Sequence, residues 1–295
     1  MRFVITGGTG FIGAYVLRQL RGHDVLCFSR NPDALPDTER LIVKLADFRN
    51  GGEWVASIKD FQPECCIHLA WEGLPDYSLS RCRINLDASL RLLDVLSQVR
   101  VKRLVVSGSC FEYGNVDGSI SEDQEADKHT VFAATKVALL KVLDAVATDF
   151  DYRWARLFFV YGPGQRLTSL IPSLRNSYVA NNTPEIRTPE IVQDFVHVED
   201  VAGALVTLGQ YDGPSGIFNV GSGYPTSVGH VANQVAQYYG HTALFDVNSK
   251  GRGFWADPQK MTSHTGWSAR IGIDEGIRKT LVALDAKPCK CRDRR

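Results

Sequence analysis

The sequence predicts an α/β fold: a Rossmann-like, doubly wound parallel sheet with a smaller C-terminal lobe. Two observations carry this prediction. A strand-like run at the N-terminus leads through closely spaced glycines into a helical stretch, the order found where a parallel sheet binds a dinucleotide. Strand-like and helical runs then alternate through the first half of the chain, as they do in βαβ units.

Five strand-like and four helical runs make up that first half. The strand-like runs are 2–6, 24–28, 64–70, 102–107 and 153–160, and the helical ones are 11–21, 52–60, 79–99 and 131–149. After Gly162-Pro-Gly164 the alternation loosens into segments rich in Pro and Asn. We therefore expect a dinucleotide-binding domain over 1–160 with a return segment at about 194–225, and a substrate-binding lobe over 161–193 and 226–295.

The composition indicates which classes of partner and which cellular compartment to expect. The 295 residues contain 33 Lys and Arg against 33 Asp and Glu, a balance that disfavours nucleic acid as a partner. No apolar run approaches the roughly 18 residues of a membrane span, so we expect a cytoplasmic protein without a membrane partner. The seven cysteines are scattered, and Cys289 and Cys291 have no second Cys or His pair nearby, so we expect reduced thiols and no metal site.

The first candidate site is the run Thr6-Gly-Gly-Thr-Gly-Phe-Ile-Gly13. Gly7, Gly10 and Gly13 have the spacing in which one glycine turns the chain, one lets the backbone approach a pyrophosphate, and one lets the helix pack against the strand. We expect these glycines, with Phe11 and Ile12 between them, to contact a dinucleotide cofactor.

The end of the second strand bears on which cofactor this is. NAD-preferring sites usually place a carboxylate there to hold the ribose hydroxyls. This chain has Ser29-Arg30-Asn31 and no acid before Asp33. A hydroxyl and a guanidinium suit the 2′-phosphate of NADP, which Arg can bind through two hydrogen bonds. The sequence therefore favours NADP(H) and leaves NAD(H) possible, and the alternative is that Arg30 is a solvated surface residue.

Further motifs follow nearly to the end of the chain, and with them the sequence resembles the extended short-chain dehydrogenase/reductase family of nucleotide-sugar epimerases, dehydratases and 4-ketoreductases. These motifs are Ala46-Asp-Phe48, His68-Leu-Ala70, Arg83-Ile-Asn-Leu86, Ser107–Gly114, Arg156–Gln165, Gln193–Val201, Phe218–Gly223 and Asp257–Lys260 leading to Gly266-Trp267. The resemblance implies cofactor contacts from Asp47 at the adenine and from Leu69, Ala70, Asn85, Ser107 and Phe159. Ser107 is alternatively the polar end of a buried strand.

The family's chemistry uses a Tyr, a Lys and a Ser or Thr around the reacting carbon, and the resemblance assigns Ser109 and Lys136 to two of these roles. The Lys also holds the nicotinamide ribose. Phe132 occupies the position of the Tyr, four residues before Lys136. Losing a positioned general acid typically costs roughly 10²–10⁴ in rate. Three explanations stay open: an inactivating Tyr-to-Phe substitution, another acid such as Tyr113, or a protein that binds without catalysing.

The residues after Ser109 indicate the reaction. Sugar dehydratases of the family place an Asp-Glu pair there, where this chain has Cys110-Phe111, so dehydration is disfavoured. Trp71-Glu-Gly-Leu-Pro75 and Phe111-Glu-Tyr113 look like the 4-keto-6-deoxysugar reductases. With the NADP-like second strand, this favours NADPH-dependent reduction of a nucleoside-diphosphate 4-keto-6-deoxyhexose at C4. The alternatives are a nucleotide-sugar 4-epimerase and a non-catalytic NADP-sensing protein.

Substrate contacts and assembly are also implied by the resemblance. Trp71, Cys110 and Phe111 are expected beside the sugar, although Cys110 is also a candidate packing residue. The family's usual Arg for the diphosphate is replaced by Gln193, which leaves Arg166, Arg187 and Arg252 as candidates. A homodimer through the helices at 79–99 and 131–149 is expected.

Overall fold

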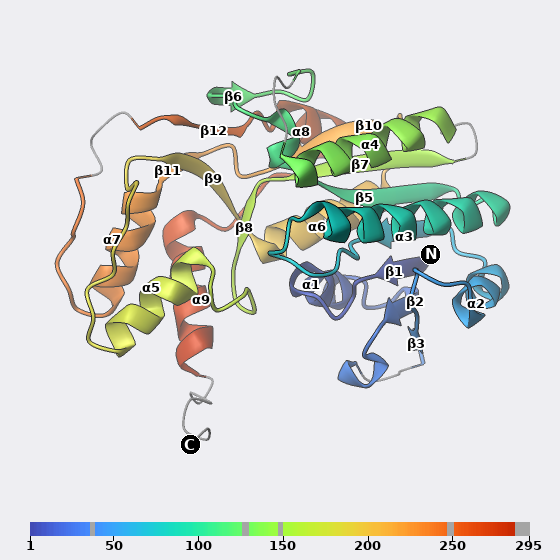
Figure 1. The fold of residues 1–295 in the computed structure, drawn as a ribbon, viewed down its shortest axis with the longest axis horizontal. Helices are drawn as coiled ribbons and strands as arrows, with labels where there is room; N and C mark the ends of the chain where they lie inside the picture. Colours follow the sequence, from blue (N-terminus) through green and yellow to red (C-terminus); the bar gives the residue numbers. More distant parts are fainter. Residues whose placement is uncertain (36–38, 126–129, 147–149, 247–250, 287–295) are drawn as a thin grey trace.

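A seven-stranded parallel sheet forms the larger part of the molecule (Figure 1). The computed structural model describes residues 1–35, 39–125, 130–146, 150–246 and 251–286. The strands lie in the order β10-β7-β5-β4-β1-β2-β3, and every neighbouring pair is parallel. Their bounds are β1 (Arg2–Thr6), β2 (Asp24–Ser29), β3 (Leu41–Leu45), β4 (Cys65–His68), β5 (Arg103–Ser109), β7 (Asp151–Leu157) and β10 (Gly216–Val220).

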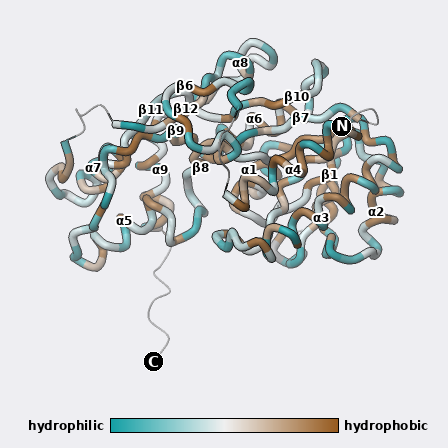
Figure 2. Tube along the Cα trace, turned by 45° about the horizontal axis from the view of Figure 1, so that its top comes forward, coloured by the Kyte–Doolittle hydropathy of each residue, from teal (hydrophilic) through white to brown (hydrophobic). Residues whose placement is uncertain are grey.

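Helices cover both faces of this sheet, which explains why its central strands are continuous apolar runs. One hydrophobic cluster packs α1 (Phe11–Gln19) and α6 (Val198–Gln210) against one face. A second cluster packs α2 (Glu53–Phe61), α3 (Leu79–Gln98) and α4 (Val131–Val146) against the other. Figure 2 shows hydrophobic segments gathered along these strands and helices, with hydrophilic segments in the outer loops. The Rossmann-like fold predicted from the sequence is confirmed.

The strand order reverses beside β1, and this reversal positions the site. The chain passes from β1 to β2 on one side, whereas β4 pairs with β1 on the other side. The segments that follow β1 and β4 therefore leave the same edge of the sheet in opposite directions. In open parallel sheets, ligands bind in the crevice at such a point.

The smaller part is built on a second, mixed sheet. Its strands are β6 (Gly118–Ile120), β8 (Phe159–Tyr161), β9 (Val192–His197), β11 (Pro225–Ser227) and β12 (Gly253–Ala256). Its helices α5 (Leu170–Val179), α7 (Val228–Tyr238) and α9 (Ile273–Asp285) share a third hydrophobic cluster. The short α8 (Gln259–Thr265) contacts β10 instead. The remaining short elements are the 3₁₀ turns η1 (Pro32–Ala34) and η2 (Cys110–Tyr113).

Several element boundaries differ from the sequence prediction. The expected strand 153–160 is two strands, because β7 ends at Leu157 while β8 leaves the main sheet to pair with β9. Within the expected return segment, α6 and β10 join the main sheet but β9 joins the second one. The edge strand β3 was not expected. Residues 147–149 of the fourth predicted helix and the tail cysteines lie outside the described residues.

No helix among the described residues is long and apolar enough to cross a membrane. Within the same ranges, no group of three His, Cys, Asp or Glu side chains could hold a metal ion.

Candidate active site

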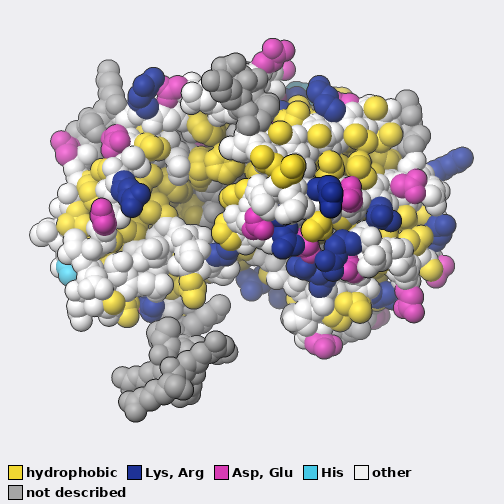
Figure 3. Space-filling view, viewed as in Figure 1, with side chains coloured by type: hydrophobic (Ala, Val, Ile, Leu, Met, Phe, Trp, Pro, Cys, Tyr) yellow, Lys and Arg dark blue, Asp and Glu magenta, His cyan; other side chains and the backbone are white. Residues whose placement is uncertain are grey.

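Two adjoining cavities open where the segments after β1 and β4 diverge. The first, of about 200 Å³, extends toward the end of β2, and the second, of about 460 Å³, extends toward the ends of β5 and α4. Both are lined by Gly7, Gly10, Leu69 and Trp71. Figure 3 shows hydrophobic side chains along the hollow between the two parts of the molecule. Together the cavities form one elongated site.

The glycine-rich turn forms the floor shared by the two cavities. Gly7 has φ +75°, and a Cβ there would lie 2.9 Å from the backbone nitrogen of Ala70. A Cβ on Gly13 would collide with the carbonyl oxygen of Gly7. No side chain caps the N-terminus of α1 at Gly10, so its backbone N–H groups face the site. This cradle fits a dinucleotide pyrophosphate.

A series of buried hydrogen bonds fixes the wall of the site opposite the glycine-rich turn. The Leu69 and Ala70 amides both donate to Thr6 Oγ1 at 3.2 Å, so the Thr6 hydroxyl donates its own proton to His68 Nδ1 at 2.7 Å. His68 Nε2 then donates to Ser89 Oγ at 3.0 Å. Burial lowers the pKa of His68 to about 3, which keeps the ring neutral. The Leu69-Ala70 backbone is thereby fixed against Gly7.

The far end of the first cavity is lined by Ser29, Arg30 and Asp47, three of the predicted cofactor-binding residues. Arg30 Nη1 lies 2.6 Å from Glu72 Oε2, although the Arg30 side chain is 63 % exposed. Arg49 Nε donates to Asp47 Oδ1 at 2.8 Å, and these hydrogen bonds lower the pKa of Asp47. Each cation at this end is therefore paired with a carboxylate.

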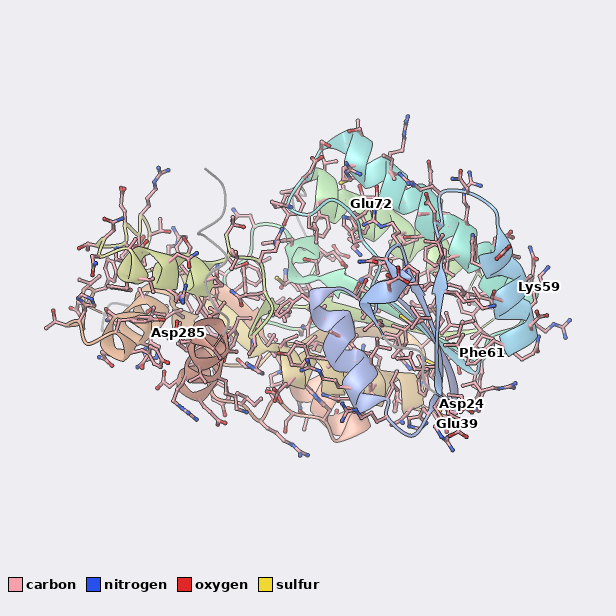
Figure 4. The ribbon with its side chains drawn as sticks, turned by 90° about the horizontal axis from the view of Figure 1, so that it is seen from below. Asp24, Glu39, Lys59, Phe61, Glu72 and Asp285 are labelled. Carbon is pink, nitrogen blue, oxygen red and sulfur yellow. The ribbon has the colours of Figure 1, made fainter. Side chains whose placement is uncertain are left out.

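Glu72, which Figure 4 labels in the larger part of the molecule, lines this cavity and is the centre of a cluster that reaches α3. Its second oxygen accepts from Arg81 Nη1 at 2.6 Å. Asn85, which lines the same cavity, accepts from the Glu72 amide at 2.7 Å and donates to the Glu72 and Arg81 carbonyls. Asn85 thus fixes the backbone of the segment that follows β4.

The second cavity brings together Ser107, Ser109, Phe132 and Lys136. Lys136 Nζ donates to the Ser107 carbonyl at 2.8 Å and lies 4.1 Å from the centre of the Trp71 ring. Burial lowers the pKa of Lys136 to about 8. Ser109 Oγ accepts from the Phe111 amide at 3.2 Å, which leaves its hydroxyl proton to donate into the cavity.

Some of the other predicted site residues line the second cavity, and others do not. Phe11, Ile12, Phe111 and Arg166 line it. Phe159 packs instead on Phe111, with ring centres 5.8 Å apart, while its neighbours Phe158 and Val160 reach the cavity. Arg187 and Arg252 line neither cavity, and Arg252 is 94 % exposed beside Asp117. The structure therefore does not bring these two arginines to the described site.

The structure corrects the predictions for Cys110 and Tyr113, because both side chains are buried in the hydrophobic core. The Tyr113 hydroxyl donates to Asn219 Oδ1 at 2.6 Å, and burial raises its pKa to about 12. Burial also raises the pKa of Cys110. Neither residue lines either cavity, so Tyr113 is not placed to replace the missing acid. The family resemblance suggested a site at these positions, but the capping box of η2 turns both side chains inward.

Four further residues that were not predicted from the sequence line the second cavity. Leu74 and Tyr77 come from the segment after Trp71, and Gln165 and Ser169 come from the segment after β8. The position of Leu74 and Tyr77 beyond a predicted strand was an available signal. Among the described residues that line this cavity, none is Asp, Glu, His or Cys.

Comparisons with known proteins agree with this geometry. A dTDP-L-rhamnose 4-epimerase of Burkholderia thailandensis is 27 % identical over 94 % of this chain and 93 % of its own length. A dTDP-4-dehydro-6-deoxyglucose reductase of Escherichia coli is 23 % identical over 96 % and 98 %. The solved structure of MoeE5 with UDP-glucuronic acid and NAD has a TM-score of 0.84 and 30 % identity, covering 97 % of this chain and 99 % of that one.

The family model for the NAD dependent epimerase/dehydratase family matches residues 3–221. This stretch contains the glycine-rich turn, the segment after β4, Ser109 and Lys136. The expected resemblance is confirmed, and the chain belongs to the NAD dependent epimerase/dehydratase family, whose members are oxidoreductases of the extended short-chain dehydrogenase/reductase kind.

Proposed function

We propose that this chain reduces the C4 carbonyl of a nucleoside-diphosphate 4-keto-6-deoxyhexose. The observation that carries the proposal is the chemistry of the second cavity, where a hydroxyl and a lysine meet and the described lining residues include no carboxylate. Eliminating water from a sugar needs a general acid and a general base. Transferring a hydride to a carbonyl needs groups that stabilise and protonate its oxygen. The cavity suits the second reaction.

The roles of the chain's own residues follow from their placement. A bound nicotinamide cofactor supplies the hydride. Ser109 donates a hydrogen bond to the carbonyl oxygen, and Lys136 places a positive charge beside it. We assign the substrate diphosphate to Arg166, which lines the same cavity. We assign the nucleotide of the substrate to the described residues of the smaller lobe.

We propose NADP(H) as the preferred cofactor. Arg30 and Ser29 line the end of the first cavity, where the adenosine ribose lies if the pyrophosphate occupies the glycine turn. Arg30 is now paired with Glu72, so a 2′-phosphate must compete with that carboxylate. A dianionic phosphate forms stronger charge-assisted hydrogen bonds with Arg than one carboxylate oxygen does.

The test is an assay with dTDP- and UDP-linked 4-dehydro-6-deoxyglucose, each with NADPH and with NADH. Expected are consumption of reduced cofactor and a C4 alcohol detected by NMR, with loss of both in Ser109→Ala. Elimination of water from dTDP-glucose, or binding confined to carbonyl compounds without a sugar, contradicts the proposal.

A 4-epimerase is the second candidate, because the dTDP-L-rhamnose 4-epimerase relative spans nearly the whole chain. The same assay separates the two reactions, since an epimerase inverts C4 without net consumption of reduced cofactor. Phe132 favours a third outcome, a protein that binds NADP and a nucleotide-sugar but turns neither over.

A further inference from the structure

The second cavity has a phenol, although not at the position of Phe132. Among the described residues that line it, Tyr77 is the one tyrosine. It precedes α3, in the segment that runs from Trp71 to Ser78, and its side chain is 42 % exposed. Tyr77 is therefore the candidate for the proton donor that Phe132 cannot be.

Tyr77 packs directly on the ring that occupies the family's Tyr position. The Tyr77 and Phe132 ring centres are 5.1 Å apart, with an angle of 60° between the rings. Trp71 packs edge-on against the same Phe132 ring at 5.2 Å, and Lys136 Nζ lies over the Trp71 ring. Tyr77 and Lys136 thus line one cavity and are linked through two ring–ring contacts and one cation–π contact.

The segment that carries Tyr77 is held at both ends. At one end, Glu72 binds Arg30 and Arg81, and Asn85 fixes its backbone. At the other end, the Ser78 amide donates to Asp76 Oδ1 at 2.9 Å, and Ser78 Oγ accepts from the Arg81 amide at the start of α3. These contacts hold Tyr77 beside the cavity rather than in a free loop.

The other ionisable groups of the cavity are less suited to donate a proton. Lys136 Nζ is held at the Ser107 carbonyl, and in the proposed reaction its charge stabilises the substrate carbonyl oxygen, whereas Arg166 does not release a proton in proteins. Tyr113 is bound to Asn219 inside the core. Tyr77 combines access to the cavity with access to water, from which a phenolate can be protonated again.

We propose that Tyr77 protonates the reduced substrate, a role that rests on the proposed reductase function. As hydride adds to C4, the π electron pair of the carbonyl moves onto oxygen and takes the phenol proton of Tyr77. The Tyr77 phenolate is then reprotonated by water at its exposed edge. Phe132 keeps the aromatic contact that holds the Tyr77 ring beside the cavity.

Three variants test the role by turnover. Tyr77→Phe should lower the rate of reduction by roughly 10²–10⁴-fold, the usual range for a positioned acid. Tyr238→Phe is the matched control, because Tyr238 is 39 % exposed on α7 and lines neither cavity. Phe132→Tyr in the Tyr77→Phe background should restore turnover by placing a phenol at the neighbouring position.

A binding measurement tests the same role without turnover. Calorimetry with NADP⁺ present compares dTDP-6-deoxyglucose, which has a C4 hydroxyl, with its 4-deoxy analogue. Tyr77→Phe should weaken only the hydroxyl compound, by roughly 2- to 12-fold, the value of one neutral hydrogen bond. Equal weakening of both ligands would mean a structural role and would overturn the proposal.

The outcomes separate the two claims. If the unmodified chain reduces the keto sugar and Tyr77→Phe reduces it equally fast, Tyr77 is not the donor and the reductase function stands. If the unmodified chain neither reduces nor binds any of these nucleotide-sugars, the reductase function fails and the role of Tyr77 fails with it.

Discussion

Lys136 combines a positive charge with almost complete burial, and this has a consequence for stability. Burial lowers its pKa from 10.5 to about 8. Between these values the unfolded chain holds a proton that the folded chain has released, so the free energy of unfolding rises with pH across that window. Below about pH 8 both states are protonated, and the cost of burying the charge is fully present.

This predicts that the unmodified protein gains stability relative to Lys136→Met as pH rises from about 8 to about 10.5. The gain should be on the order of 3 kcal/mol, since one unit of pKa corresponds to about 1.4 kcal/mol. Denaturant unfolding of both proteins across this range measures it. Lys141→Met, on the exposed side of α4, serves as the control. A difference between wild type and Lys136→Met that does not change with pH would contradict the prediction.

The carboxylate of Glu72 is shared between Arg30 and Arg81, so it competes with any anion for Arg30. Glu72→Gln should therefore raise the affinity for NADP⁺ relative to NAD⁺. Arg30→Ala should lower the affinity for NADP⁺ by roughly 10- to 100-fold, the range for a charge-assisted hydrogen bond. Calorimetric titration of both cofactors measures these changes, with Arg40→Ala as an exposed control. Equal affinities for the two cofactors in the unmodified chain would contradict the NADP preference.

The packing of β1 against α1 requires glycine at position 13. A Cβ on Gly13 would meet the Gly7 carbonyl, which is backbone and cannot rotate away. Gly13→Ala should destabilise the protein by roughly 1–3 kcal/mol, the usual cost of overpacking, and weaken cofactor binding. Thermal unfolding and cofactor titration measure the two effects. Gly51→Ala is the control, because its added Cβ would meet nothing within 4 Å. Similar behaviour of the two variants would exclude the close packing as the cause.

How far the sequence predicts an element depends on where its partners lie. β1, α1, α2 and α3 were predicted closely, because the apolar pattern that defines each lies within one short stretch of sequence. The division between β7 and β8 was missed, since it depends on pairing with β9 about thirty residues later. The same limit applies to the site. Its glycines and Lys136 belong to motifs, whereas the contact between Tyr77 and Phe132 joins a loop and a helix that only the tertiary fold brings together.

The surface of the molecule includes an exposed apolar stripe on α4. Val131, Ala134, Ala138, Val142 and Ala145 recur at helical spacing and are exposed. We expect this stripe, with the adjacent α3, to pair with a second copy of the chain. Val142→Glu should therefore convert a dimer into a monomer while leaving the fold intact, as measured by sedimentation and circular dichroism. Val282→Glu is the control, since Val282 is similarly exposed on α9. A monomeric unmodified protein would contradict the expected homodimer.

The position of Trp71 should make ligand binding at the site detectable by tryptophan fluorescence. Its indole nitrogen is buried without a hydrogen-bond partner, and its ring lies under the Lys136 ammonium. Of the five tryptophans, it is the one that lines the two cavities among the described residues. A ligand that contacts the indole or shifts the ammonium changes the electric field across the chromophore. Intrinsic fluorescence should therefore shift on cofactor or sugar binding, and Trp71→Phe should abolish the shift while titration calorimetry still detects heat.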